Sequence, residues 1–312
     1  MGGGLRALLS CLLVLGSQCA SRSVERAAVD LDHVSRWWIF LGHADDPGSM
    51  DWSAATRTTE LVILSDDPRI PLRAIHPRTV RLAYLSVGEA ESGRTYWRSI
   101  QRRSFLVEEN PDWPGNIRVD IRDRRWQDVL LNTEAPRLLG MGFQGFMLDT
   151  IETAPYLEAK DPVRFAGARQ ALRELLAAFR HSFPGAIILV NGTEALVDAA
   201  PFVDGYVTES LFATHDAAAE NGGGYRPTTA EERSWRLAQV DRALARARRP
   251  VFTVEYAADG GGDGNGREPG APGRLAAWAA GMARRRGFKP FITVRAINRL
   301  PASPLAPAAT PP

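Results

Sequence analysis

Cysteine is almost missing from this chain of 312 residues, and both of its cysteines, Cys11 and Cys19, stand within the first 20 positions. The remainder of the chain can therefore contain neither an internal disulfide nor a thiolate metal site. Histidine is also scarce, with five residues in the whole sequence. These two shortages argue against a zinc centre and against a thiol nucleophile.

An excess of either charge is lacking as well. Lys and Arg together number 38 against 36 for Asp and Glu, which gives a formal net charge of +2. This balance does not indicate a nucleic-acid surface. Two arginine clusters, "RDRR" (Arg122–Arg125) and "ARRR" (Ala283–Arg286), lie beside helical patterns and are interpreted as solvated faces. The hydrophobic fraction of 45% and the charged fraction of 24% are typical of a globular chain with one large core.

The apolar run near the N-terminus is too short to span a bilayer comfortably. Arg6 precedes the run, which extends from Ala7 to Leu15, and small residues follow it. This order is typical of a secretory signal peptide, so residues 1–22 are predicted to direct export and to be removed. Lipid attachment at Cys19, which would tether the protein to a membrane, is an alternative that stays open. The predicted location is periplasmic, secreted or lipid-anchored at the cell surface.

Eight short apolar runs alternate with amphipathic helical patterns along the middle of the chain. Near-continuous apolar runs suit parallel strands that are covered on both faces. An α/β fold, a (β/α)8 TIM barrel over residues 30–299, is therefore predicted. The alternative, an open doubly wound sheet, lacks its usual Gly-rich nucleotide fingerprint after the first strand. The Pro/Ala-rich tail, residues 300–312, is predicted to be disordered. The runs are Trp37–Gly42, Leu61–Asp66, Arg81–Glu89, Gly145–Thr150, Ala186–Gly192, Gly205–Ser210, Val251–Ala257 and Pro290–Ala296.

Most of these predicted strands end on a polar or charged residue. In a (β/α)8 barrel the C-terminal strand ends form the active site, so these side chains are expected at one mouth. Glu209 and Glu255 are flanked closely by apolar residues, in "YVTESLF" and "FTVEYA", and buried acids are costly unless they are paired or used. The strand-end residues are Asp66, Glu89, Asp149, Asn191, Glu209, Glu255 and Arg295.

Several carboxylates at one mouth are typical of glycoside hydrolysis, which needs one carboxylic acid and a second carboxylate on either side of the scissile bond. Tyr96, Trp97 and Trp113 follow the third strand and are candidate surfaces for sugar rings. No Gly-x-Ser-x-Gly elbow is present. The acidic loop Asp259–Gly266 lacks the spacing of an EF-hand and is interpreted as a flexible loop. Neither a metal nor a cofactor is expected.

Five ordered motifs resemble a bacterial family. They are "YLSVGEAESGRTYW", "NPDWPGNIRVDIRDRRWQ", "GFQGFMLDTIETA", "VDGYVTESLF" and "VFTVEYA". Together they resemble the endo-α-1,4-polygalactosaminidase-related proteins of glycoside hydrolase family 114, (β/α)8 barrels similar to the hydrolase domain that trims the Pel exopolysaccharide. The resemblance implies that Asp149 and Glu209 are the catalytic acids. It also implies substrate-binding roles for residues of the matching blocks, namely Glu89, Arg94, Tyr96, Glu255 and Tyr256. Asn191 is a further substrate-binding candidate, because it closes a predicted strand at the barrel mouth.

The sequence as a whole predicts an exported glycoside hydrolase that cleaves internal α-glycosidic bonds in a polysaccharide containing galactosamine or N-acetylgalactosamine. Asp149 and Glu209 are the predicted pair, and Glu255 is the reserve candidate because the seventh strand opens onto the same mouth. Which carboxylate is the acid, and whether the reaction retains or inverts configuration, stay open. The alternative is a secreted barrel that binds carbohydrate without cleaving it. A monomer is expected.

Overall fold

The computed structural model describes residues 29–42, 51–216, 218, 224–257, 273–295 and 297. The predicted signal peptide with Cys19, the loop Asp259–Gly266 and the tail from residue 300 lie outside these residues. Among the described helices, none is both long and apolar enough to cross a membrane.

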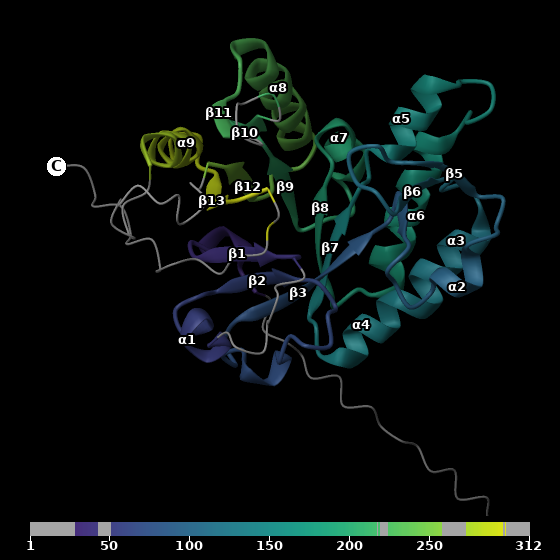
Figure 1. Ribbon diagram of the computed structural model, residues 1–312, viewed down its shortest axis with the longest axis horizontal. Helices are drawn as coiled ribbons and strands as arrows, with labels where there is room; N and C mark the ends of the chain where they lie inside the picture. The colour runs from purple at the N-terminus through teal and green to yellow at the C-terminus, as the bar shows by residue number, and fades with distance from the viewer. Residues whose placement is uncertain are drawn as a thin grey trace, which may run out of the picture.

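The core is an eight-stranded parallel sheet curled into a nearly closed barrel with helices outside it (Figure 1). All eight predicted barrel strands are confirmed. Each strand pairs in parallel with the next one in this order, and β2 is buried along its whole length, as its apolar run predicted. The strands in sheet order are β1 (Trp37–Phe40), β2 (Leu61–Leu64), β3 (Val80–Ser86), β7 (Gly145–Asp149), β8 (Ile187–Asn191), β9 (Gly205–Glu209), β12 (Val251–Tyr256) and β13 (Lys289–Thr293).

The helices form because their apolar side chains recur at helical spacing. In α6, Leu172, Leu175, Leu176 and Phe179 follow an i, i+3, i+4, i+7 pattern and are all buried against the barrel. Helix α8 begins at a capping box made by Thr229 and Glu232. The described α-helices are α1 (Trp52–Thr56), α2 (Trp97–Ile100), α3 (Arg124–Asp128), α4 (Ala135–Met141), α5 (Thr153–Lys160), α6 (Ala168–Ser182), α7 (Leu196–Ala199), α8 (Ala230–Arg246) and α9 (Arg274–Arg285).

The barrel closes between its first and last strands through side chains. The indole Nε1 of Trp37 in β1 donates to the Lys289 carbonyl oxygen at 3.1 Å, and the Trp37 ring lies 5.7 Å from that of Phe291. Beyond the strands, the Leu41 amide donates to the Ile297 carbonyl at 2.8 Å. Within the described part of the chain, no strand ladder joins β1 to β13. We call this junction the β1–β13 seam.

Two small sheets were not predicted. A three-stranded antiparallel sheet, β4 (Glu89–Glu91), β6 (Asn116–Val119) and β5 (Leu106–Glu109), follows β3, and a hairpin, β10 (Ala213–Asp216) and β11 (Gly224–Pro227), follows β9. The predicted strand Arg81–Glu89 was too long, because β3 ends at Ser86 and Glu89 begins β4. Gly88 permits this break, since a Cβ there would lie 2.1 Å from the Thr150 carbonyl oxygen.

Candidate active site

Three neighbouring parallel strands, β7, β8 and β9, end on Asp149, Asn191 and Glu209, at the same end of the barrel. The Asn191 side-chain nitrogen lies between the two acids. It donates to Asp149 Oδ1 at 2.8 Å and to Glu209 Oε1 at 2.7 Å. Because one nitrogen reaches both oxygens at these distances, the two oxygens are at most about 5.5 Å apart, which matches the short carboxylate spacing of retaining glycosidases. The fold therefore brings the two predicted catalytic residues together.

The residue after each acid has a left-handed backbone. Thr150 has φ 60° and Ser210 has φ 53°, a region that non-glycine residues rarely occupy and that costs roughly 1–3 kcal/mol. The Thr150 hydroxyl oxygen accepts from the Gly88 amide at 2.9 Å. The Ser210 amide donates to the Val254 carbonyl at 2.9 Å. These bonds hold strained turns that end both strands abruptly and leave each carboxylate on the last residue of a rigid strand.

Each acid also contacts a buried tyrosine. The Tyr256 hydroxyl, from the end of β12, donates to Glu209 Oε2, and Tyr84, from β3, is hydrogen-bonded to Asp149. Burial, with the nearby carboxylates, raises the pKa of both tyrosine hydroxyls well above its usual range. Both hydroxyls therefore keep their protons and act as donors to the acids. Tyr256 was among the predicted residues, whereas Tyr84 was missed, although its polar hydroxyl in the mostly buried strand β3 was a signal.

Burial raises the pKa of Asp149 to about 7, and the nearby Glu209 carboxylate contributes to the rise. Asp149 therefore holds its proton up to near neutral pH. Burial and the charge of Asp149 also raise the pKa of Glu152 well above its usual range. Glu152 Oε2 is buried and has no hydrogen-bond partner among the described residues. A third acid thus lies within electrostatic reach of the pair.

Glu255 and Glu89 face different surroundings from the pair. Glu255 is fully buried, and its Oε2 accepts from the Phe212 amide at 2.9 Å and the Ala213 amide at 2.8 Å. Since successive strand residues point to opposite sides, Glu255 points away while Tyr256 reaches Glu209. Its burial raises its pKa to about 7. Glu255 therefore fixes the backbone just after Glu209.

Glu89 is buried in β4. Its Oε1 accepts from the Asn110 side chain at 2.8 Å and lies 3.7 Å from Arg118 Nε, while Oε2 has no described partner. Burial raises the pKa of Glu89, and its charge contributes to the raised pKa of Glu152. Glu89 is thus coupled to the acids at the strand ends from the small antiparallel sheet, not from a barrel strand.

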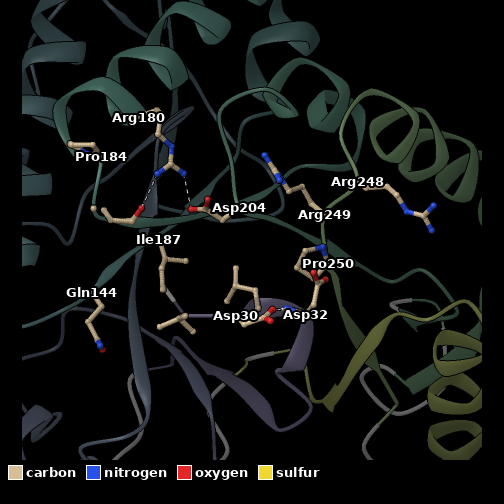
Figure 2. Close-up of a pocket in the computed structure, with 14 residues that line it drawn as sticks. Asp30, Asp32, Gln144, Arg180, Pro184, Ile187, Asp204, Arg248, Arg249 and Pro250 are labelled. Carbon is tan, nitrogen blue, oxygen red and sulfur yellow. Dashed lines mark hydrogen bonds and ion pairs between the residues drawn. The ribbon is translucent and has the colours of Figure 1, made fainter. Parts of the chain in front are cut away.

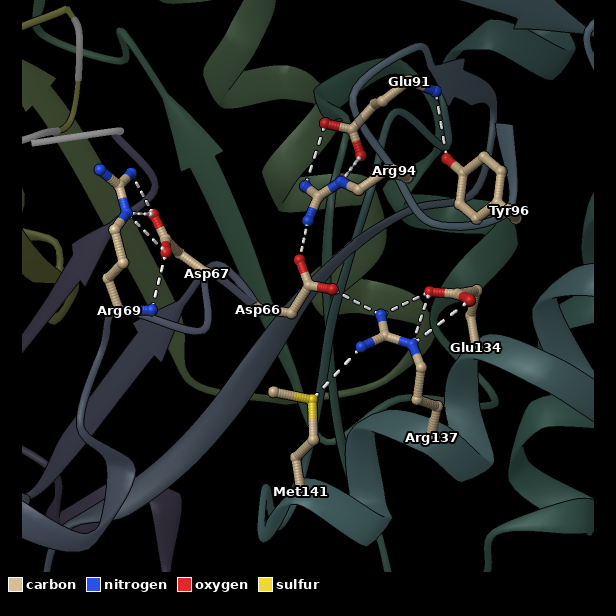
Figure 3. A network of polar contacts seen from close by, with 9 residues as sticks. All are labelled: Asp66, Asp67, Arg69, Glu91, Arg94, Tyr96, Glu134, Arg137 and Met141. Carbon is tan, nitrogen blue, oxygen red and sulfur yellow. Dashed lines mark hydrogen bonds and ion pairs between the residues drawn. The ribbon is translucent and has the colours of Figure 1, made fainter. Parts of the chain in front are cut away.

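Arg94 and Tyr96 belong to a polar network that also includes Glu91 and Asp66 (Figure 3). Arg94 binds Glu91 through two nitrogens, at 2.7 and 3.1 Å, and also contacts Asp66, which Arg137 contacts as well. Its guanidinium carbon lies 5.4 Å from the centre of the Tyr84 ring. Tyr96 is buried and its hydroxyl accepts from the Glu91 amide at 3.1 Å. Both predicted residues therefore support the tyrosine that binds Asp149.

The model of glycoside-hydrolase family GH114 matches residues 21–300 of the chain. The chain belongs to family GH114. It is thus a glycoside hydrolase, which confirms the enzyme class and the family resemblance. An uncharacterized protein of Deinococcus radiodurans is 30% identical over 257 residues, covering 78% of this chain and 76% of that protein. A second uncharacterized protein, from Thermotoga maritima, is 28% identical over 193 residues, 58% of this chain and 56% of that protein.

Solved structures of similar fold include the glycoside hydrolase domain of PelA from Pseudomonas aeruginosa. It has a TM-score of 0.66 and 23% identity, covering 86% of this GH114 chain and 97% of that domain. Ega3 of Aspergillus fumigatus, in complex with galactosamine, has a TM-score of 0.58 and 15% identity, covering 85% of this chain and 93% of Ega3. These likenesses confirm the predicted barrel fold.

Proposed function

We propose that Asp149 and Glu209 are the catalytic carboxylates and that the reaction retains anomeric configuration. The Asn191 bridge, which limits two of their oxygens to a separation of about 5.5 Å, carries this proposal. One carboxylate attacks the anomeric carbon while the other, protonated, gives its proton to the departing glycosidic oxygen. Water then attacks the glycosyl-enzyme ester, and the second residue takes a proton from that water.

We propose as substrate a polysaccharide containing galactosamine or N-acetylgalactosamine, cleaved at internal α bonds. The acids around the pair would attract a cationic amino sugar. The similar fold of Ega3 has been solved with galactosamine, which supports the same class of sugar. Two aromatic side chains, Trp113 at 47% and Tyr156 at 41% exposure, offer surfaces for neighbouring sugar units, whereas Tyr96 is buried.

Export is part of the proposal, with residues 1–22 as the signal peptide, 30–299 as the catalytic barrel and 300–312 as a tail. The order of Arg6, the apolar run to Leu15 and the small residues after it supports this division. Sequencing the N-terminus of protein recovered from outside the cytoplasm should give a start between Cys19 and Ser23. An intact Met1 on a cytoplasmic protein would contradict export.

The decisive experiment incubates purified protein with partly deacetylated galactosaminan and measures reducing ends. Early products are also analysed by proton NMR, which distinguishes a retained from an inverted anomeric centre. Asp149→Asn and Glu209→Gln should each reduce turnover by several orders of magnitude, and the exposed Glu174→Gln should not. Glycan binding without any release of reducing ends would contradict catalysis on this substrate, and an inverted first product would refute the retaining mechanism.

A further inference from the structure

The end of the barrel opposite Asp149 and Glu209 carries a dense group of exposed arginines. They come from the end of α8 with the turn before β12, and from the end of α9 with the turn before β13. Because β12 and β13 are paired in parallel, their N-terminal ends lie side by side. We call this group the basic patch, and its seven members, all exposed, are Arg242, Arg246, Arg248, Arg249, Arg284, Arg285 and Arg286.

Contacts within the protein occupy only part of the basic patch. Arg286 pairs with Asp241 at 2.6 Å, which ties α9 to α8, and Arg249 Nε donates to the Val203 carbonyl at 2.9 Å. Arg285 contacts the Met282 sulfur at 2.7 Å. Four guanidinium groups have no hydrogen bond or ion pair to any described residue, namely Arg242, Arg246, Arg248 and Arg284. Helix C-termini favour basic residues, but Arg248 and Arg249 lie beyond the end of α8, so helix capping does not explain them.

The N-terminal part of the chain joins the barrel beside the basic patch. A pocket of about 440 Å³ at this end is lined by Val29–Asp32 on one side and by Arg248, Arg249 and Pro250 on another (Figure 2). Two of the three acids along it are engaged: Asp30 pairs with His33 at 2.6 Å, and Asp204 pairs with Arg180 at 2.7 Å, whereas the third is Asp32. The segment that precedes Val29 in the sequence is thus attached next to Arg248, which has no described partner, and Arg249.

The short stretch of sequence between Cys19 and Val29 also limits how far Cys19 can lie from the basic patch. Cys19, the candidate lipid-attachment residue, stands ten positions before Val29. Ten residues reach at most about 35 Å when fully extended. A lipid on Cys19 would therefore keep this end of the barrel near the bilayer. A single acyl chain gives marginal binding, and a polybasic surface is a recognised second signal.

We propose that the basic patch docks on a membrane surface of anionic phospholipid headgroups. The guanidinium groups match phosphate oxygens in charge and in hydrogen-bond geometry. In this orientation the C-terminal strand ends, with the acidic residues Asp149, Glu152 and Glu209, face away from the lipid. The proposal concerns a surface remote from the catalytic pair and is independent of the proposed substrate.

The test measures sedimentation of the full chain with phosphatidylglycerol vesicles and with phosphatidylcholine vesicles. Cys19→Ser is introduced throughout, so that no acyl chain contributes. Each arginine near an anionic surface changes the partition coefficient about fivefold, equivalent to about 1 kcal/mol. The triple variant Arg246→Gln, Arg248→Gln, Arg249→Gln should therefore bind phosphatidylglycerol about 100-fold more weakly. The matched control is Arg98→Gln, Arg102→Gln, Arg103→Gln, three exposed arginines outside the basic patch, and it should bind as the parent does.

Binding should also disappear at about 0.5 M salt and on phosphatidylcholine, while hydrolysis of soluble glycan stays unchanged in both triple variants. Equal loss of vesicle binding in the two triple variants would refute a specific surface. Failure of the parent to bind phosphatidylglycerol at low salt would also overturn the proposal. Tighter retention by a soluble polyanion such as heparin than by vesicles would assign the basic patch to a polyanionic polymer instead of a membrane.

Discussion

Replacing Asp149 by asparagine probes the site through protein stability as well as through activity. The pKa of Asp149 is raised to about 7 in the folded protein, against 3.8 for a free side chain. Between these two values the unfolded chain releases the proton while the native state keeps it. The free energy of unfolding of the native enzyme therefore falls as pH rises from about 4 to 7, and it levels off above pH 7.

Each unit of pKa difference corresponds to about 1.4 kcal/mol, so Asp149 lowers the stability of the enzyme by about 4 kcal/mol above neutrality. An asparagine at this position would have no proton to release. It would keep the bond from Asn191 but would satisfy Tyr84 less well, at a cost of about 2 kcal/mol. We therefore expect Asp149→Asn to be less stable than the parent near pH 4.5 and more stable by about 2 kcal/mol at pH 8.

The assay is thermal unfolding at several pH values between 4.5 and 8, with turnover measured on the same samples. For a chain of this size, 1 kcal/mol corresponds to about 2–4 °C in Tm. The sign of the Tm difference should reverse within the range, while activity is lost throughout it. Asp128→Asn, which changes an exposed carboxylate in α3, is the control variant measured in parallel. Parallel curves for Asp149→Asn and the parent would refute the raised pKa.

Four further outcomes are expected. In the parent, kcat/KM should decline as pH rises above about 7, because Asp149 then loses its proton; an activity that stays flat to pH 9 would contradict this. Asn191→Ala should lower kcat/KM by roughly 100-fold without unfolding the barrel, since it removes donors to both acids; circular dichroism checks the fold. Ser210→Gly should raise Tm by about 2–4 °C, because glycine accepts the left-handed backbone without strain; a lower Tm would mean that the serine side chain outweighs the strain. Glu255→Gln should lower Tm but leave turnover within tenfold of the parent, and loss of activity in a folded Glu255→Gln protein would reassign the catalytic pair.

The barrel could be predicted because each of its strands is a short apolar run and most of these runs end on a polar residue. Asp149, Asn191 and Glu209 were placed at one end for the same reason, since parallel strands share their C-terminal edge. Side-chain direction was harder to predict. Glu255 and Tyr256 are adjacent, and only the register of β12 decides which of them reaches Glu209.

The three-stranded antiparallel sheet could not be predicted from the sequence, for another reason. Its strands are short, β5 and β6 are mostly half-buried, and the sheet depends on tertiary contacts such as the bond between Asn110 and Glu89 at 2.8 Å. Local residue patterns therefore carried little signal for them. Tyr84 was overlooked because its partner Asp149 lies 65 positions later, and the local signal, a polar hydroxyl in a buried strand, does not identify that partner.

Because of the β1–β13 seam, the cost of separating neighbouring strands differs around the barrel. Elsewhere, separating two barrel strands breaks several ladder hydrogen bonds at once, whereas at the seam it mainly pulls the Trp37 indole from its contacts with β13. The least costly local opening of the barrel is therefore expected along this line, with the first and last strands swinging apart while the strands on the far side stay paired. Asp149, Asn191 and Glu209 lie on that far side, on the third to fifth strands counted from β13. Local opening between β1 and β13 can therefore occur without moving the Asp149 and Glu209 carboxylates relative to each other.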